Sequence, residues 1–266
     1  MLSEVANSRK IWTPVESIDI LIDNVRTILS GNDFTVYLFG SICYDDFKLG
    51  WSDIDILILT EKTLSENQAE QLVNLRQTLL EVYRENRYFR SFEGGILSIN
   101  EFLNKKQERV VYWGTSGQRI TDNYCFDVFS TMQLKDSGIL IYGNNIRNQI
   151  QYPSYDEIVQ AVANHYRTIR NYAVKPGRNL YSIGWMLDIA RCLYTLSERK
   201  IISKTNAGYW ALEKGLVPNV EVMKKVIKIR ENPMMYKDKI EVQDWSETLG
   251  PIIQEFADVL EKRLLV

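Results

Sequence analysis

The chain has 266 residues, of which 45% are hydrophobic and 25% are charged, so a substantial globular core is available. Its formal net charge of −2 argues against a dedicated nucleic-acid binder, which usually carries a strong basic excess. The three cysteines lie far apart and form no CxxC pair, which argues against a disulfide framework and a zinc site. The first residues show no apolar signal segment, and no apolar run reaches the ~18 residues of a membrane span, so we expect a cytoplasmic protein with no membrane or nucleic-acid partner.

The first 150 residues mix two hydrophobic periodicities. Apolar residues at helical spacing alternate with short β-rich runs, a pattern that indicates a small mixed α/β domain, which we place at residues 1–150. The expected elements are a helix at 15–29, strands at 34–39 and 54–59, a helix at 65–86, a strand at 92–99 and a helix at 124–134.

The rest of the chain is helical in pattern. We place an α-helical bundle domain at residues 151–266, so the predicted fold class is α+β. A break at Lys175-Pro176-Gly177 separates two of its helices. The expected helices cover 155–173, 181–196, 204–214, 220–231 and 242–264.

Two carboxylates mark the second predicted strand. Asp53 and Asp55 are two positions apart, so both side chains point to the same face. Like charges repel each other and lose solvation when buried, and an otherwise apolar strand would not keep them without compensation. A divalent cation is the simplest compensation, and Mg²⁺ prefers such oxygen ligands and also binds substrate phosphates. We therefore predict Asp53 and Asp55 as catalytic metal ligands.

A glycine and a serine end the preceding strand. Gly40 lets the backbone approach a ligand closely, and Ser41 offers a hydroxyl and an N–H to a phosphate. Ser52 begins the carboxylate strand beside a turn, and we include it among the nucleotide-binding residues. A phosphate-binding turn beside a carboxylate pair predicts phosphoryl or nucleotidyl transfer.

A third carboxylate is expected because two-metal chemistry usually requires one. Glu93 stands at the start of the third predicted strand, and the neighbouring Gly94-Gly95 would leave room for a ligand. As a general base, Glu93 would take the proton of an acceptor hydroxyl. We also predict it as a ligand of one of two Mg²⁺ ions.

These residues resemble the pattern of the polymerase-β-type nucleotidyltransferase family, in the runs Leu38-Phe39-Gly40-Ser41 and Ser52-Asp53-Ile54-Asp55. More narrowly, the chain resembles the aminoglycoside adenylyltransferases that modify streptomycin and spectinomycin. Phe92-Glu93 and the short run after it resemble the region of that family's catalytic-base glutamate. The segment 138–143 resembles the end of its first domain.

The predicted helical half resembles the C-terminal helical domain of the same family, in the run Leu187-Asp188-Ile189-Ala190-Arg191-Cys192-Leu193-Tyr194. In that family an arginine and a lysine reach the ATP phosphates, and by position these are Arg191 and Lys204. A tyrosine that stacks on adenine would be Tyr236. The resemblance thus implies ATP as co-substrate, with part of its site on the helical domain; both cations would oppose the triphosphate charge.

The resemblance implies transfer of AMP from ATP to a hydroxyl of a small molecule, with release of pyrophosphate. An aminoglycoside or aminocyclitol antibiotic is the expected acceptor, antibiotic resistance is the expected role, and a monomer is the expected state. Three alternatives stay open: transfer to a lincosamide, transfer to a protein as in antitoxin-type AMPylation, and a non-catalytic nucleotide-binding module.

Two segments depart from the family's pattern. The turn after Ser41, at 42–47, is one residue longer and carries less glycine. The loop at 174–179 supplies acidic and aromatic drug contacts in the family but is basic here, which departs from the pattern for streptomycin.

Some conspicuous residues have plain structural interpretations. We expect the single histidine, His165, to be structural, and Tyr181 and Trp185 to be core residues. The segment 112–119 either lines an acceptor pocket or is a loop packed by Trp113.

Overall fold

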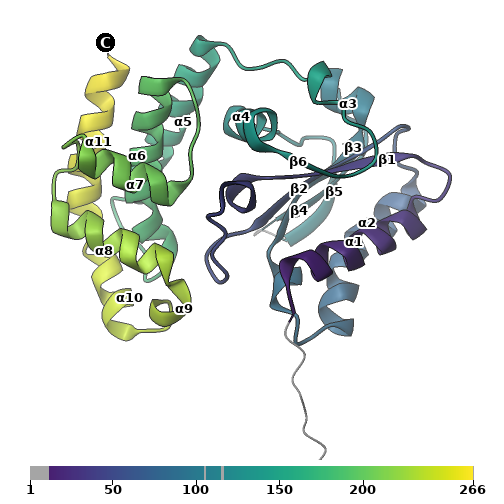
Figure 1. Ribbon diagram of the computed structural model, residues 1–266, viewed down its shortest axis with the longest axis horizontal. Helices are drawn as coiled ribbons and strands as arrows, with labels where there is room; N and C mark the ends of the chain where they lie inside the picture. Colours follow the sequence, from purple (N-terminus) through teal and green to yellow (C-terminus); the bar gives the residue numbers. More distant parts are fainter. Residues whose placement is uncertain (1–11, 105, 115–116, 266) are drawn as a thin grey trace, which may run out of the picture.

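The computed structural model describes residues 12–265, apart from residues 105 and 115–116. A six-stranded mixed sheet dominates residues 12–149, the sheet half (Figure 1). Its strands lie in the order β5-β4-β3-β2-β1-β6; β2 and β3 are parallel, and the other neighbours are antiparallel. The strands are β1 (Phe34–Phe39), β2 (Ile54–Thr60), β3 (Phe92–Ser98), β4 (Val110–Gly114), β5 (Gly117–Thr121) and β6 (Ile139–Tyr142).

Helices cover both faces of this sheet. In Figure 1, α1 and α2 lie on one face and α3 and α4 on the other. Two hydrophobic clusters fill these layers, one centred on Leu21, Ile56 and Leu72 and one that includes Tyr37 and Leu134. The strands β1 and β2 are therefore buried on both faces, which explains their continuous apolar sequences. The helices are α1 (Pro14–Ile28), α2 (Glu66–Val82), α3 (Ile99–Asn104) and α4 (Val128–Ser137).

In the described part of the chain, three short 3₁₀ helices connect these elements. The first follows β1 directly and carries Gly40 and Ser41. The third ends at Gln149, shortly before the helical part begins. They are η1 (Gly40–Tyr44), η2 (Arg87–Arg90) and η3 (Arg147–Gln149).

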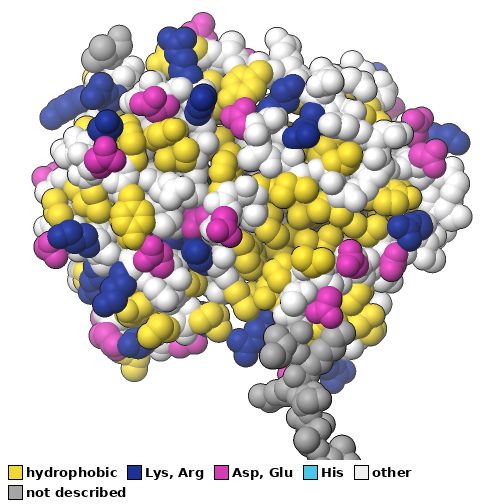
Figure 2. Space-filling view, viewed as in Figure 1, with side chains coloured by type: hydrophobic (Ala, Val, Ile, Leu, Met, Phe, Trp, Pro, Cys, Tyr) yellow, Lys and Arg dark blue, Asp and Glu magenta, His cyan; other side chains and the backbone are white. Residues whose placement is uncertain are grey.

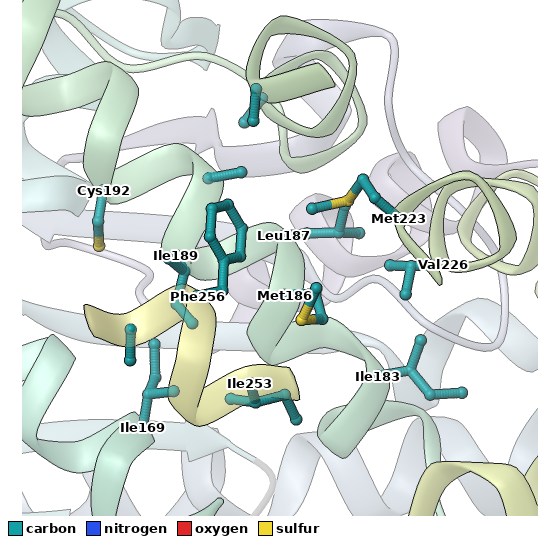
Figure 3. Packing of buried hydrophobic residues seen from close by; sticks show 14 of the residues in the cluster. Ile169, Ile183, Met186, Leu187, Ile189, Cys192, Met223, Val226, Ile253 and Phe256 are labelled. Carbon is teal, nitrogen blue, oxygen red and sulfur yellow. The ribbon is translucent and has the colours of Figure 1, made fainter. Parts of the chain in front are cut away.

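Helices alone build residues 155–265, the helical half. The long helix α6 runs through its centre and contributes Leu187 and Ile189, which are fully buried (Figure 3). Phe256 from α11 packs against the same cluster. The helices are α5 (Tyr155–Tyr172), α6 (Leu180–Glu198), α7 (Lys204–Glu213), α8 (Val220–Glu231), α9 (Pro233–Tyr236), α10 (Ile240–Glu247) and α11 (Gly250–Leu264). The predicted α+β fold class is confirmed.

Several predicted elements need correction. The helix expected at 124–134 begins only at Val128, because Asp127 is its N-cap and accepts a hydrogen bond from the Ser130 N–H at 2.7 Å. The helix expected at 242–264 is two helices, since a new helix starts at Gly250 and Pro251 cannot donate a backbone hydrogen bond within a longer one.

The segment 112–119 is not a plain loop, and its described residues line none of the three described cavities. Its described residues belong to the hairpin of β4 and β5. Trp113 is buried in the core, and its indole Nε1–H donates to the Leu72 carbonyl at 3.0 Å. No helix in the described part of the chain combines the length and the apolar character that crossing a membrane requires.

Candidate active site

Three strand ends bring the predicted carboxylates and the Gly-Ser turn together. In the antiparallel pair of β1 and β2, Phe39 lies opposite Asp55, so Gly40 follows beside that carboxylate. In the parallel pair of β2 and β3, Asp55 lies opposite Glu93. The pairing of these three strands therefore places Gly40, Asp55 and Glu93 at one edge region of the sheet.

Gly40 is required at its position for two reasons. Its φ of +71° lies in the left-handed region that glycine adopts without strain. A Cβ added there would also overlap the carboxylate of Asp55. The backbone of the turn thus touches the carboxylate that we predicted to bind a metal.

The charged forms of the two aspartates are disfavoured in this site. The pKa of Asp53 is raised to about 7, because burial, the charge of Glu93 and a hydrogen bond shared with Glu93 favour its protonated form. The pKa of Asp55 is raised well above its usual range by burial and by the charges of Asp53 and Glu93. Protein groups alone therefore do not stabilise both aspartates as anions.

A divalent cation would offset this unfavourable negative charge. Among the described residues, no three His, Cys, Asp or Glu side chains form a group arranged to hold a metal ion. Asp53 and Asp55 offer oxygen ligands only, and Mg²⁺ is commonly held by one or two carboxylates together with substrate phosphates. A cation beside them would restore their ionised forms. The assignment of Glu93 as a further metal ligand stays a prediction.

Glu93 is oriented by a tyrosine. The Tyr112 hydroxyl on β4 donates to Glu93 Oε1 at 2.8 Å. Burial, followed by this hydrogen bond, raises the pKa of Tyr112 to about 12, so the phenol stays protonated and remains a donor. The Arg119 guanidinium lies over the Tyr112 ring at 4.6 Å from its centroid. The carboxylate of Glu93 is thus held in a defined direction near Asp53.

The Gly-Ser turn offers a polar group without a protein partner. Ser41 Oγ is buried and has no hydrogen-bond partner among the described residues. A buried hydroxyl of this kind is costly unless a ligand or water satisfies it. Ser52 differs, because its Oγ accepts the Lys48 N–H at 3.0 Å and so stabilises the turn before β2. The nucleotide-binding role of Ser52 stays a prediction.

Two cations face these groups from the helical half. Asp188 Oδ1 lies 3.1 Å from Arg191 Nη2 and 3.1 Å from Lys204 Nζ. Although burial alone would raise it, the pKa of Asp188 is held far below its usual range by the charges of Lys204 and Arg191 and by His165. His165 Nε2 is 3.8 Å from Asp188 Oδ1.

One cavity of about 280 Å³ joins the two sets of residues. On the surface, Figure 2 shows acidic and basic side chains close together where the sheet half meets the helical half. The cavity wall is built from both halves. Of the predicted site residues, it includes Gly40, Ser41, Ser52, Asp53, Asp55, Arg191 and Lys204.

Two predicted residues lie elsewhere. Glu93 does not line this cavity. It contacts Asp53, which does line it. Tyr236 on α9 is partly buried against the helical core, and Lys239 Nζ lies 5.2 Å from its ring centroid. Tyr236 lines none of the three described cavities, so its stacking on adenine stays a prediction.

The sequence interpretation was wrong for Tyr181. We expected a core residue, but its side chain is 64% exposed and lines the cavity, because it stands in the first turn of α6. Trp185, one turn later, is half-buried; it packs against the helical core and also lines the cavity.

Sequence reasoning missed Asp188, Asp46 and Arg230, all of which are buried charged residues in the cavity wall. A signal for Asp188 was present, since it is the one acidic residue within the apolar run 187–193. Asp46 and Arg230 are far apart in sequence, and nothing local to either predicts that they meet.

A Gly-Ser turn, a half-buried carboxylate pair and an opposing pair of cations form the arrangement that we predicted for a nucleotidyltransferase site. Comparisons with known protein families agree with this assignment. Residues 18–107 match the model of the nucleotidyltransferase domain, and residues 153–262 match that of the aminoglycoside adenylyltransferase C-terminal domain. The chain therefore carries a nucleotidyltransferase domain followed by an aminoglycoside adenylyltransferase C-terminal domain, and it is an enzyme that transfers AMP.

A solved structure supports the same fold over nearly the whole chain. The spectinomycin adenyltransferase AAD(9) from Enterococcus faecialis, determined with ATP and spectinomycin, is 16% identical with a TM-score of 0.60. The match covers 93% of this chain and 99% of that one. No curated protein matches this chain.

Proposed function

We propose that this enzyme transfers AMP from ATP to a hydroxyl of a small molecule in a Mg²⁺-dependent reaction that releases pyrophosphate. One observation carries the proposal: a single cavity is lined by Ser41, Asp53 and Asp55 on one side and by Arg191 and Lys204 on the other. The carboxylates of this wall would face the metal ion, and its two cations would face the negatively charged triphosphate. The boundary between the catalytic domain (1–150) and the helical domain (151–266) would fall between η3 and α5.

Asp53 and Asp55 would hold Mg²⁺, which would neutralise phosphate charge and make pyrophosphate a better leaving group. Arg191 and Lys204 bind the triphosphate and oppose its charge from the helical half. Ser41 Oγ, buried and without a partner in the described structure, donates to a phosphate oxygen. Together these residues hold the α-phosphate for attack by the acceptor.

Glu93 accepts the proton of the attacking hydroxyl. The Tyr112 hydroxyl, 2.8 Å from Oε1, fixes the direction of the carboxylate. This bond engages one carboxylate oxygen. The hydrogen bond that Glu93 shares with Asp53 would be lost when a cation keeps Asp53 ionised, which would leave the other oxygen for the acceptor. The pocket for that acceptor lies next to Asp53: a second cavity, of about 350 Å³, is lined by Asp53, Trp51 and Tyr181.

We propose an aminocyclitol or aminoglycoside as the acceptor and antibiotic resistance as the role. Support comes from the C-terminal domain family and from the fold shared with the spectinomycin enzyme. The loop after α5 bears on the charge of the acceptor. Arg178, which lines the second cavity, is paired with Asp244 and with Glu247, whose Oε2 is 3.4 Å from Nη1. The charged residues that line this cavity are Asp53, Arg178 and Lys237, so its wall carries no net negative charge. This favours a weakly charged aminocyclitol over a polycation.

The test uses ATP labelled at the α-phosphate, with Mg²⁺ and a panel of spectinomycin, streptomycin, lincosamides and proteins. We expect label on spectinomycin-like aminocyclitols. A preparation of Glu93→Gln serves as the control, since it keeps the hydrogen-bonding shape but removes the base. Label on a lincosamide or a protein alone would replace the proposed acceptor. Transfer from γ-labelled but not α-labelled ATP would contradict the chemistry itself.

A further inference from the structure

A buried acidic residue connects the two halves of the molecule. Asp46 lies in the turn between η1 and β2 and is only 4% exposed. Its carboxylate reaches into the helical half. Asp46 Oδ1 accepts the Thr205 hydroxyl at 2.6 Å, and Oδ2 accepts the Thr205 N–H at 3.3 Å. The first turn of α7 is thus bonded to the sheet half.

A buried arginine completes this contact. Arg230 on α8 is 2% exposed, and its Nη2 donates to Asp46 Oδ2 at 3.3 Å and to the Asp46 carbonyl at 3.1 Å. Its guanidinium also lies over the Trp51 ring, with Cζ 5.3 Å from the centroid. Burial lowers the pKa of Arg230, and the carboxylate of Asp46 opposes this effect. A buried charge without its partner is strongly unfavourable, so both residues hold each other in place.

The contact joins the two sides of the proposed triphosphate site at adjacent residues. On the sheet side, the Asp46 N–H donates to the Ser41 carbonyl at 3.0 Å, so Asp46 is bonded to the Gly-Ser turn. On the helical side, its partner Thr205 directly follows Lys204 in α7. Asp46 therefore bridges the backbone of Ser41 and the neighbour of Lys204.

We propose that Asp46 is a positioning residue that sets the distance between the Gly-Ser turn and Lys204, and with it the affinity for the triphosphate. The inference rests on the proposed function, since it assumes that a triphosphate occupies the cavity. Asp46 contacts no substrate in this account and acts through Thr205 and Arg230. A purely structural ion pair would affect the stability of the fold and leave the relative affinity for different nucleotides unchanged.

Thr205→Val provides a mild test, because valine has nearly the shape of threonine and removes only the hydroxyl that Asp46 accepts. Thr205→Ser restores this hydroxyl and serves as the rescue. Tyr209→Phe is the matched control: it removes a hydrogen bond between α7 and α8, from Tyr209 to Glu231 at 2.7 Å, that lies within the helical half. All three variants are made in the full chain.

Calorimetry would measure the dissociation constants of an ATP analogue with a methylene between its α- and β-phosphates, and of AMP, each with Mg²⁺. For Thr205→Val we expect about a tenfold weaker binding of the analogue, the size expected for a lost hydrogen bond to a charged group, and unchanged binding of AMP. Thr205→Ser and Tyr209→Phe should bind both as the wild type does.

The outcomes separate the two proposals. Equal affinity of Thr205→Val and wild type for the analogue would overturn the positioning role, even if the variant unfolds at a lower temperature. An equal loss for the analogue and AMP would also overturn it, because the effect would then not act on the β- and γ-phosphates. If the wild type does not bind the analogue at all, the proposed function fails, and this inference fails with it.

Discussion

Asp188 and Lys204 form an ion pair inside the molecule, with Nζ 3.1 Å from Oδ1, and the same carboxylate oxygen lies 3.1 Å from Arg191 Nη2. Asp188 is only 6% exposed. Burial lowers the pKa of Lys204, and Asp188 opposes this effect more than any other group. Asp188 is therefore the buried counterion that keeps two half-buried cations together, facing the carboxylates of the sheet half.

This relationship predicts a pH-dependent loss of stability in Asp188→Asn. A carboxyl whose pKa is lowered in the folded state stabilises the fold above its unfolded pKa and loses this contribution as the pH falls. At pH 7 the free energy of unfolding of the variant should be about 3–5 kcal/mol lower than that of the wild type, because two half-buried cations lose their buried counterion. Below pH ~4 the difference should shrink by roughly 1.4 kcal/mol per pH unit.

Urea unfolding of both proteins between pH 7 and pH 3 would measure this difference. Asp258→Asn is a suitable control, because Asp258 also pairs with an arginine but is largely exposed, with 55% of its side chain accessible. A difference between Asp188→Asn and wild type that stays constant over this pH range would contradict the account.

Gly40→Ala should abolish nucleotide binding. The change strains a left-handed backbone position and places a Cβ where the Asp55 carboxylate lies. Gly31→Ala is its matched control: Gly31 has a similar φ of +80°, and an added Cβ there would meet nothing within 4 Å. Both variants should lose roughly 1–3 kcal/mol of stability from backbone strain, and only Gly40→Ala should lose binding of the ATP analogue, as measured by calorimetry. Equal binding by the two variants would show that the contact between Gly40 and Asp55 is unimportant.

Glu93→Gln should separate catalysis from binding. Glutamine can still accept the Tyr112 hydroxyl, but it cannot take a proton from the acceptor. We expect kcat to fall by at least about 10²-fold, while the affinity for Mg-ATP changes little. Steady-state transfer of α-labelled AMP would measure kcat. A variant that keeps wild-type kcat would remove Glu93 from the role of general base.

Asp55→Asn should stabilise the protein without ligands. The pKa of Asp55 is raised by burial and by two neighbouring carboxylates, so its ionised form destabilises the fold increasingly as the pH rises. Replacing it with a neutral amide removes this repulsion. Thermal unfolding in EDTA at pH 8 should therefore give a higher Tm for the variant, whereas a lower Tm would mean that the carboxylate is stabilised by protein groups alone.

The sheet half was largely predictable where burial imposes a pattern. β1, β2 and β3 begin where expected, because β1 and β2 are apolar on both faces and conspicuous turn residues adjoin these strands. β5 was missed because it is an edge strand whose sequence, GQRIT, is mostly exposed and carries no apolar periodicity. Its partner β4 was missed with it, since its aromatic residues suggested a pocket wall.

Only those site residues that stand out in their local sequence could be predicted. Asp53 and Asp55 are conspicuous within one strand, and Gly40 is conspicuous at the end of another. Contacts such as that of Asp46 with Thr205 join positions 159 residues apart, and each residue is unremarkable in its own segment. Only the packing of the helical half against the turn after β1 brings them together.

In the proposed reaction, Asp55 and the cations of the helical half bind one Mg-triphosphate ligand in one cavity. Calorimetric titration of the wild type, Asp55→Asn and Lys204→Met with the methylene ATP analogue, with and without Mg²⁺, measures this binding. We expect Mg²⁺-dependent binding by the wild type, loss of the Mg²⁺ dependence in Asp55→Asn, and weaker binding in Lys204→Met. Binding of the analogue by all three proteins with the same affinity, and equally well in EDTA, would contradict it.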